Sequence, residues 1–238
     1  MKNIGIISRK ELLSYLTSPM AYIVTAIFLA LSGTFFSTYL AGTNYTDTSI
    51  RGFLNAAQIL ILLFAAVLTM RLVAEEKKLG TWELLLTAPI RDAEIILGKF
   101  LGALGVLTGM LVLTLYYPIL LMVFGDPDLG PIGTSYLGLL LLGSACLSIG
   151  IFASTLTSNQ IVSAVVAGGI LFALWFLGAV AGFAPGDLGE VLSYLSLAHH
   201  FPEFIRGIVD TKAIVYYLSV TALFLYLATG SIETGRWR

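Results

Sequence analysis

The side chains of this sequence that could do chemistry are few, and their spacing does not build a catalytic centre. Glu75 and Glu76 are adjacent acids at the end of an apolar run, a position where carboxylates could serve an intramembrane hydrolase. However, Gly80 stands where an E-E-x-x-x-R element has arginine, and no histidine lies within an apolar run to complete such a site. We therefore interpret the two glutamates as a solvated helix face that pairs with Lys77, Lys78 or a partner.

The metal-ligating and nucleotide-binding signals are equally weak. His199 and His200 are adjacent, so on a helix their imidazoles point in different directions, which is a poor arrangement for one metal ion. Cys146 is the single cysteine, so neither an internal disulfide nor a zinc cluster can form. No G-x-x-x-x-G-K-[ST] motif is present to hold a nucleotide phosphate. We predict no catalytic, cofactor-binding or metal residues, and a chain that is not itself an enzyme.

The composition instead predicts an integral membrane protein. The chain is 58% hydrophobic and 11% charged, with a net charge of −1, whereas a soluble domain carries about 25% charged residues. Several apolar runs reach the length of about 20 residues that a membrane helix needs. We expect an all-α fold in a single domain, 1–238, with six spans at approximately 21–41, 53–73, 101–124, 135–155, 161–183 and 213–231.

Charged residues lie between the spans or at their ends, and their placement predicts the topology. No Asp, Glu, Lys, Arg or His lies in the interior of a span, which argues against a proton relay or an ion pump, and no basic tract indicates a nucleic-acid partner. Positive residues are retained on the cytoplasmic side of short loops. We therefore expect a multi-pass protein of the cytoplasmic (inner) membrane with both termini in the cytoplasm, where ten of the 13 lysines and arginines would lie: Lys2, Arg9, Lys10, Arg71, Lys77, Lys78, Arg91, Lys99, Arg236 and Arg238.

Residues before the first span should form a separate helix. Ser18 is a good N-cap and Pro19 favours the first helical position, so the first span should start there. The segment that precedes them is imperfectly amphipathic, with a broad apolar face. We expect it to lie in the headgroup region of the bilayer as an interfacial helix.

The charged segment 75–99 should contain two helix ends and a short helix between them. Two lysines followed by Gly80 predict the end of the second helix, because cations favour its last turn and glycine adopts a left-handed conformation. A short helix can follow from Thr81 to Leu86, stopped by Pro89. We expect helix, short helix, turn and helix in this order.

The third long helix should begin at Asp92, as an N-cap, with Glu94 in its first turn, and Pro118 should kink it. Four glycines of this helix are spaced by four, three and four residues, so they share one face and allow a neighbouring backbone to approach closely. We interpret this face as packing within one protomer, with a dimer seam as the alternative. The four residues are Gly98, Gly102, Gly105 and Gly109.

The segment between the fifth and sixth spans has two helix starts, at Asp187 and Pro202. Its apolar residues suggest short extracytoplasmic helices that dip into the outer membrane interface. Such helices could form a gate, and a simple lid is the alternative. The candidate gate residues are His199, His200, Phe201 and Phe204.

The polar segment also resembles a family signature. Its residues E-E-K-K-L-G-T-W-E-L-L-L-T-A-P at 75–89, followed by Ile95, Gly98 and Lys99, contain the pattern E-x-x-x-G-T-x-E-x-L-L-x-x-P-x-x-x-x-x-I-x-x-G-K. This signature is similar to that of ABC-2 type transporter permeases. Within that family the chain most resembles gliding-motility (GldF-like) and nitrous-oxide-reductase-maturation type permeases. The resemblance extends over the whole chain and is weak for substrate.

The resemblance implies a permease subunit in the lipid bilayer that pairs with an identical or a second permease and binds two separate ABC ATPase subunits. The ATPase subunits would hold the ATP and Mg. A large extracytoplasmic protein is a further partner that the resemblance leaves open. A coupling helix would rest in the ATPase, with Leu84 to Leu86 holding it to the bilayer or core. The implied coupling residues are Glu75, Glu76, Gly80, Thr81, Trp82, Glu83, Leu84, Leu85 and Pro89, and, in the loop 157–160, Ser158 and Asn159.

Two functions of different class follow from these observations. The first is an ATP-driven permease that moves an unidentified substrate across the cytoplasmic membrane. The second is a membrane scaffold of a motility or envelope assembly that binds an ATPase without transporting cargo. A response of ATP hydrolysis to cargo would separate the two.

Overall fold

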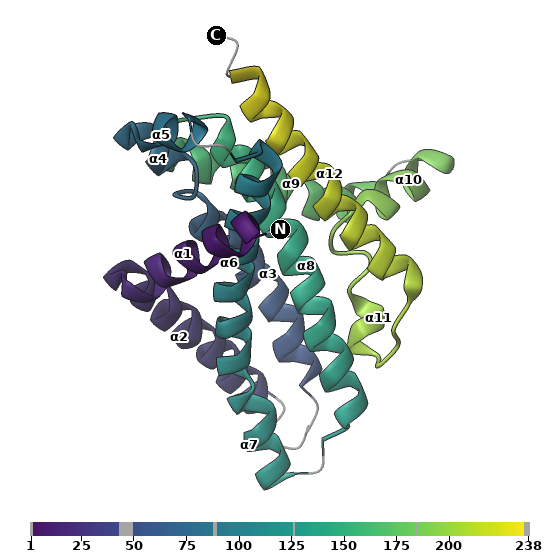
Figure 1. Cartoon of the computed structure of the whole chain (residues 1–238). Helices are drawn as coiled ribbons and strands as arrows, with labels where there is room; N and C mark the ends of the chain where they lie inside the picture. The colour runs from purple at the N-terminus through teal and green to yellow at the C-terminus, as the bar shows by residue number, and fades with distance from the viewer. Residues whose placement is uncertain (1, 43–49, 88–89, 126, 184, 236–238) are drawn as a thin grey trace.

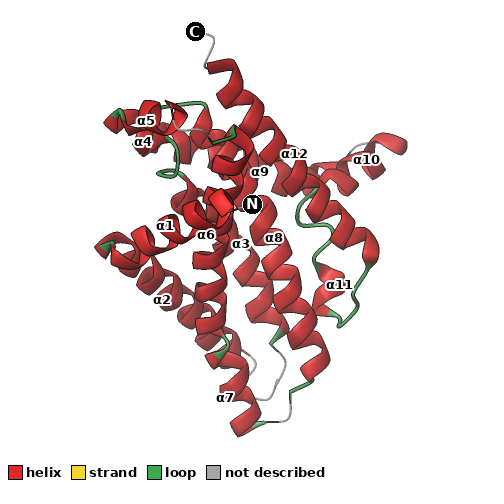
Figure 2. Cartoon of the chain, viewed as in Figure 1, coloured by secondary structure: helices red, strands yellow, loops and turns green. Residues whose placement is uncertain are grey.

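The computed structural model describes residues 2–42, 50–87, 90–125, 127–183 and 185–235, which form helices joined by turns and loops, without strands (Figures 1 and 2). Pro89, Arg236 and Arg238 lie outside the described residues. The helices are α1 (Lys2–Thr17), α2 (Pro19–Gly42), α3 (Arg51–Thr69), α4 (Ala74–Leu79), α5 (Thr81–Thr87), α6 (Asp92–Thr114), α7 (Tyr116–Phe124), α8 (Leu129–Thr155), α9 (Gln160–Ala181), α10 (Asp187–Leu195), α11 (Pro202–Ile205) and α12 (Thr211–Gly235).

Among the described residues, six helices or helix pairs are long and apolar enough to cross a membrane, which confirms the predicted all-α fold with six spans. They are α2, α3 with α4, α6 with α7, α8, α9 and α12. Each contains or overlaps one of the predicted runs, and most extend a few residues beyond it. The shorter helices α1, α5, α10 and α11 lie outside these spans.

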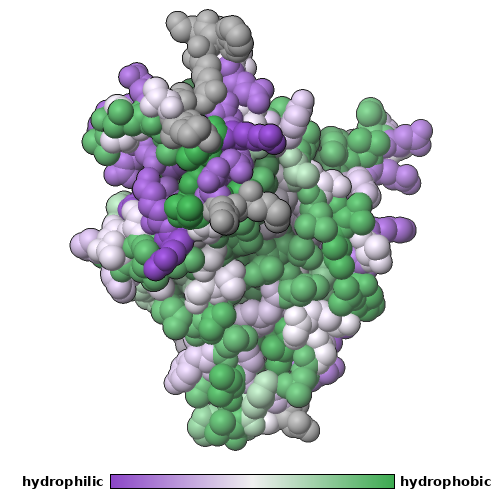
Figure 3. Space-filling view, viewed as in Figure 1, coloured by the Kyte–Doolittle hydropathy of each residue, from purple (hydrophilic) through white to green (hydrophobic). Residues whose placement is uncertain are grey.

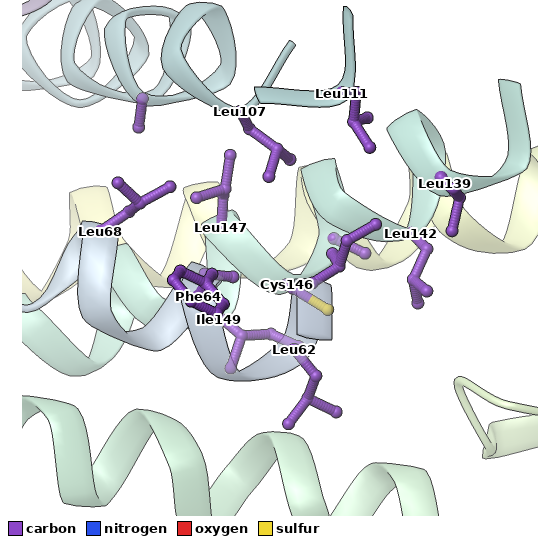
Figure 4. Packing of buried hydrophobic residues seen from close by; sticks show 14 of the residues in the cluster. Leu62, Phe64, Leu68, Leu107, Leu111, Leu139, Leu142, Cys146, Leu147 and Ile149 are labelled. Atoms are coloured by element: carbon purple, nitrogen blue, oxygen red, sulfur yellow. The ribbon is translucent and has the colours of Figure 1, made fainter. Parts of the chain in front are cut away.

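Helix α8 is the centre of the bundle. In its most apolar stretch 78% of the residues are buried, against 17% in α2 and in α9, and α8 contacts α3, α6, α9, α11 and α12. Figure 4 shows Cys146 and Leu147 of α8 among leucines of α3 and α6. Close approach is possible because a Cβ atom added at Gly143 would lie 2.3 Å from the side chain of Leu107.

The second membrane helix is interrupted by a side chain of α8 before its predicted end. Helix α3 ends at Thr69, whereas we expected the helix to continue without interruption to Gly80, where α4 ends. Ser154 of α8 accepts hydrogen bonds from the backbone N–H groups of Val73 (3.1 Å) and Ala74 (3.0 Å). Its hydroxyl also lies 3.3 Å from the carbonyl of Met70. Ser154 therefore takes the place of the helical acceptors and caps α4.

The third membrane helix is broken where a proline requires it. Helix α6 ends at Thr114 and α7 begins at Tyr116, so the break lies at the carbonyl four residues before Pro118. Tyr117 of α7 then bonds the hydroxyl of Ser32 (2.9 Å) and donates to the carbonyl of Leu29 (3.1 Å). These contacts hold α7 against α2.

The start of α6 differs by one residue from the predicted cap. Arg91 is extended and occupies the N-cap position, whereas Asp92 is the first helical residue and is buried. The carboxylate of Glu94 lies 3.4 Å from the backbone nitrogen of Arg91 and accepts from the amide of Asn3 at 3.0 Å. Glu94, rather than Asp92, therefore accepts from the cap backbone and also contacts α1.

Candidate functional site

The polar end of the molecule is built around α4 and α5, which form a helical hairpin. Gly80 joins the two helices with φ of 71°, a left-handed conformation that glycine adopts without strain. Its N–H bonds the carbonyls of Glu76 and Lys77. Figure 3 shows hydrophilic residues gathered over this end, whereas hydrophobic residues cover much of the remaining visible face.

The hairpin presents one outward face and one anchored face. Trp82 is buried in the hydrophobic core, and the partly buried Leu85 packs against this core. Leu84 is 72% exposed, and Thr81 and Glu83 are also exposed. Within the protein, Trp82 and Leu85 hold this helix to the core, and the expected contact of the outward-facing Leu84 with the bilayer stays a prediction.

The two adjacent glutamates make different contacts from those predicted. Glu75 pairs with Arg71 at 3.7 Å. Glu76 pairs with Lys99 of α6 at 2.8 Å and with Lys10 of α1 at 3.6 Å. The interpretation of Glu76 as a solvated residue beside Lys77 and Lys78 was wrong, because the fold places it at the meeting point of three helices.

Lys77 connects the hairpin to the loop between α8 and α9. Its ammonium donates to the carbonyl of Thr155, the last residue of α8. The adjacent loop contains Ser158 and Asn159, both exposed. The side chain of Asn159 caps α9 by accepting from the N–H of Ile161 at 2.9 Å. The two segments predicted to contact a partner are thus joined through Lys77.

Three of the four predicted packing glycines lie against α1. A Cβ atom added at Gly98, Gly102 or Gly105 would lie 2.6 Å from side-chain atoms of Ile7, Glu11 and Leu12, respectively. Gly109 has no such neighbour within 4 Å and instead borders an apolar groove of about 370 Å³ between α1, α2 and α6. The neighbour of this face is thus the N-terminal helix of the same chain.

The four predicted gate residues meet in pairs, with the ring centroids of His199 and His200 5.3 Å apart and those of Phe201 and Phe204 6.4 Å apart. Phe201 and Phe204 are fully buried, and the Phe204 carbonyl accepts from Thr134 (2.7 Å) and Ser135 (3.1 Å) of α8. Both phenylalanines therefore pack against the bundle, and the position of these short helices at the outer membrane interface stays a prediction. His199 is exposed and borders a cavity of about 570 Å³.

The second histidine is part of an aromatic cluster. The ring of His200 lies 4.1 Å from that of Tyr216, and its Nε2 is 2.9 Å from the carbonyl of Tyr194. Burial of the imidazole lowers its pKa, because the charged form loses solvation. The side chain of His200 is therefore buried among aromatic residues and is not exposed at the surface.

Sequence patterns alone did not single out Lys99, a fully buried charged residue at the polar end. Lys99 was treated as part of a motif, yet its side chain is 1% exposed and lies 2.9 Å from Glu11 of α1. The available signal was the spacing of Ile7, Glu11 and Tyr15, which places an acid on the face of α1 that packs inward. The capping role of Ser154 had no comparable local signal.

These features define a multi-pass membrane protein whose spans meet a polar helical hairpin at one end. A family model for the ABC-2 family transporter protein matches residues 6–232, nearly the whole chain. The chain therefore belongs to the ABC-2 family of transporter proteins. Members of this family are typically non-enzymatic membrane subunits, and the family implies an ABC ATPase partner. No curated protein matches the chain.

Proposed function

We propose that this chain is the permease subunit that moves a substrate across the cytoplasmic membrane, driven by a separate ATPase that grips the α4–α5 hairpin. The observation that carries the proposal is the division of α5 into an anchored Trp82 and an outward-facing Glu83 and Leu84. A soluble partner can contact the outward face while the anchored face transmits its movement. The exposed Ser158 and Asn159 would form a second, smaller contact.

The hairpin is connected to three membrane helices, which suits a mechanical role. Helix α4 follows α3 through the segment capped by Ser154, Lys77 holds the end of α8, and Glu76 pairs with Lys99 of α6. Packed elements with defined contacts move as rigid bodies rather than bending continuously. A push on α5 would therefore reach α3, α6 and α8 together.

The orientation of the chain in the membrane, its partners and its class of substrate belong to the same proposal. The hairpin and both termini would lie in the cytoplasm, and the chain would pair with an identical or a second permease to bind two ATPase subunits. Because the predicted span interiors lack charged residues, a lipid-like, hydrophobic or peptide-linked substrate is favoured over a small ion. The narrower similarity to gliding-motility and nitrous-oxide-reductase-maturation permeases remains a prediction.

Leu84→Arg tests the proposed contact. The substitution should weaken binding of the ATPase subunit by about tenfold or more, because an exposed apolar contact is replaced by a charge. Co-purification and ATP hydrolysis in lipid nanodiscs measure the effect. Leu188→Arg on α10 is the matched control, because Leu188 is 65% exposed and α10 lies on the other side of the molecule from the hairpin, so binding should be unchanged (Figure 1). Unchanged binding by Leu84→Arg contradicts the assignment of this surface.

The scaffold function makes a different prediction for the same complex. A transporter should change its rate of ATP hydrolysis when cargo is added, whereas a scaffold should hydrolyse ATP at a rate that is flat across lipid-like and peptide substrates. A flat response from a complex that forms normally would replace transport by the scaffold function.

A further inference from the structure

The N-terminal helix α1 is docked tightly on the third membrane helix. Ile7, Glu11 and Tyr15 are buried and recur every four residues, so they form one stripe along α1. This stripe meets the face of α6 where glycines leave room for it. The polar member, Glu11, is 8% exposed. A buried carboxylate in an otherwise apolar stripe requires a partner.

That partner is Lys99, which is shared by two carboxylates from different helices. Its Nζ lies 2.9 Å from Oε1 of Glu11 in α1 and 2.8 Å from Oε1 of Glu76 in α4. Lys10 of α1 lies 3.6 Å from the same oxygen of Glu76. The cluster of Lys99, Glu11, Glu76 and Lys10 thus contains two positive and two negative charges and joins α1, α4 and α6. We call it the lysine cluster.

Within the described part of the chain, the second carboxylate oxygen of Glu76, Oε2, is buried and makes no hydrogen bond, so the charge of Glu76 depends on the partners of the first oxygen. The carboxylate is therefore compensated through Oε1, by Lys99 at the shorter distance. Breaking a buried pair leaves an uncompensated charge, which is costlier than losing an exposed pair. Separating the helices joined by Lys99 should therefore cost more than losing an exposed ion pair.

Further contacts fix the other end of α1. The Tyr15 hydroxyl donates to the carbonyl of Leu68 in α3 at 2.5 Å, and the guanidinium of Arg71 lies 4.8 Å from the centre of the Tyr15 ring. Burial raises the pKa of the Tyr15 hydroxyl. Helix α1 is therefore bound to α6 along its length and to α3 at Tyr15, and Glu76 and Lys10 add a connection to α4.

We infer that Lys99 is a positioning residue that makes α1 part of the unit moved by the ATPase, because the lysine cluster ties α1 and the hairpin to α6. This inference rests on the proposed function. A movement of the hairpin is carried to α6 and to α1 through the two ion pairs of Lys99. Helix α1 is then a working element of the permease rather than an independent membrane anchor.

A distance measurement on the full chain in lipid nanodiscs tests the connection directly. Cys146→Ala removes the single cysteine, and Leu13→Cys on α1 and Thr87→Cys on α5 place spin labels at exposed positions that avoid the proposed contact at Leu84. Double electron–electron resonance should give one narrow distance distribution. Lys99→Met should broaden or shift it. Lys78→Met is the matched control, because Lys78 is an exposed lysine on α4, and it should leave the distribution unchanged.

A paired variant separates the connection from simple loss of folding. Lys99→Met/Glu11→Gln removes one positive and one negative charge, so Glu76 keeps Lys10 as a partner and the balance of charge is retained. It should insert and bind the ATPase subunit as the unmodified chain does. Its ATP hydrolysis in the complex should fall by roughly 2- to 30-fold, the range expected when coupling between sites is weakened. Lys99→Arg, which keeps the charge, should restore part of the rate.

The outcomes distinguish this inference from the proposed function. If the paired variant keeps a narrow distance distribution and a normal hydrolysis rate, the inference is overturned while the permease function stands. If the unmodified chain binds no ATPase subunit, the proposed function fails, and the spin-label distances still report whether Lys99 ties α1 to the hairpin. A broadened distribution with lower hydrolysis in a folded complex supports both.

Discussion

At the polar end, the size of single side chains matters as much as their charge. Gly102 is the clearest case, because a Cβ atom there would lie 2.6 Å from the Cβ of Glu11, a contact that folded proteins do not make. The neighbouring Gly98 and Gly105 meet α1 at the same distance. The close approach of the two helices brings Glu11 within reach of Lys99. Glycine spacing on α6 and an ion pair therefore depend on one another.

Gly102→Ala and Gly109→Ala form a matched pair of tests on one helix. Alanine favours a helix over glycine by about 1 kcal/mol, so Gly109→Ala, with no neighbour within 4 Å, should raise stability by up to that amount. Gly102→Ala should instead lower it by about 1–3 kcal/mol, because α1 must move away. Unfolding monitored by tryptophan fluorescence in detergent measures both. Equal effects would show that α1 is not packed closely here.

At the scale of elements, the second membrane helix is divided by a side chain of a distant helix. Ser154 of α8 binds the N–H groups of Val73 and Ala74, so the chain can leave α3 and start α4 in a new direction. The break places Glu76 towards Lys99 and Lys77 towards Thr155. The orientation of the hairpin is therefore decided in part by α8, at the centre of the bundle.

Ser154→Ala should destabilise the junction of α3 and α4. Two buried N–H groups lose their acceptor, which costs about 1–3 kcal/mol. Hydrogen exchange measured by mass spectrometry should increase at residues 70–79. Ser148→Ala is the control on the same helix, because Ser148 is also fully buried but bonds only the carbonyl of Ala145 within α8. If both variants exchange like the unmodified chain, Ser154 does not hold the junction.

At the scale of the whole molecule, charge is distributed unevenly. Eight of the 13 lysines and arginines lie in or beside α1 and the hairpin, whereas α10 and α11 carry Asp187, Glu190 and Glu203. The eight are Lys2, Arg9, Lys10, Arg71, Lys77, Lys78, Arg91 and Lys99. By the positive-inside rule the hairpin should face the cytoplasm. This orientation is the premise of the proposed function, because an ATPase can reach the hairpin only from that side.

Cysteine labelling in intact cells tests this orientation. In the Cys146→Ala background, Asp187→Cys should react with a membrane-impermeant maleimide added outside. Lys78→Cys should react only after the membrane is permeabilised. Both positions are exposed in the structure, so access to the reagent is decided by the membrane. The reverse pattern would place the hairpin outside and exclude contact with a cytoplasmic ATPase.

The sequence by itself determined the features that depend on neighbouring residues. Runs of apolar residues predicted six membrane helices, and the structure contains six such helices. Gly80 and the residues after it predicted a helix end and a short helix, and these are present. Pro118 predicted a kink, and the helix is interrupted between Thr114 and Tyr116. These signals are local, because helix ends and breaks follow from caps, left-handed glycines and missing N–H donors within one turn.

The tertiary structure decided which side chains meet across long stretches of chain. Glu11 and Lys99 are 88 residues apart, and Ser154 and Val73 are 81 apart, so no local pattern specifies either contact. Packing likewise turned Leu84 outward and buried Phe201 and Phe204. Burial and charge compensation depend on where helices lie in three dimensions. For this protein, the sequence specified the helices, and their packing selected the residues that connect α1 and the hairpin to α6.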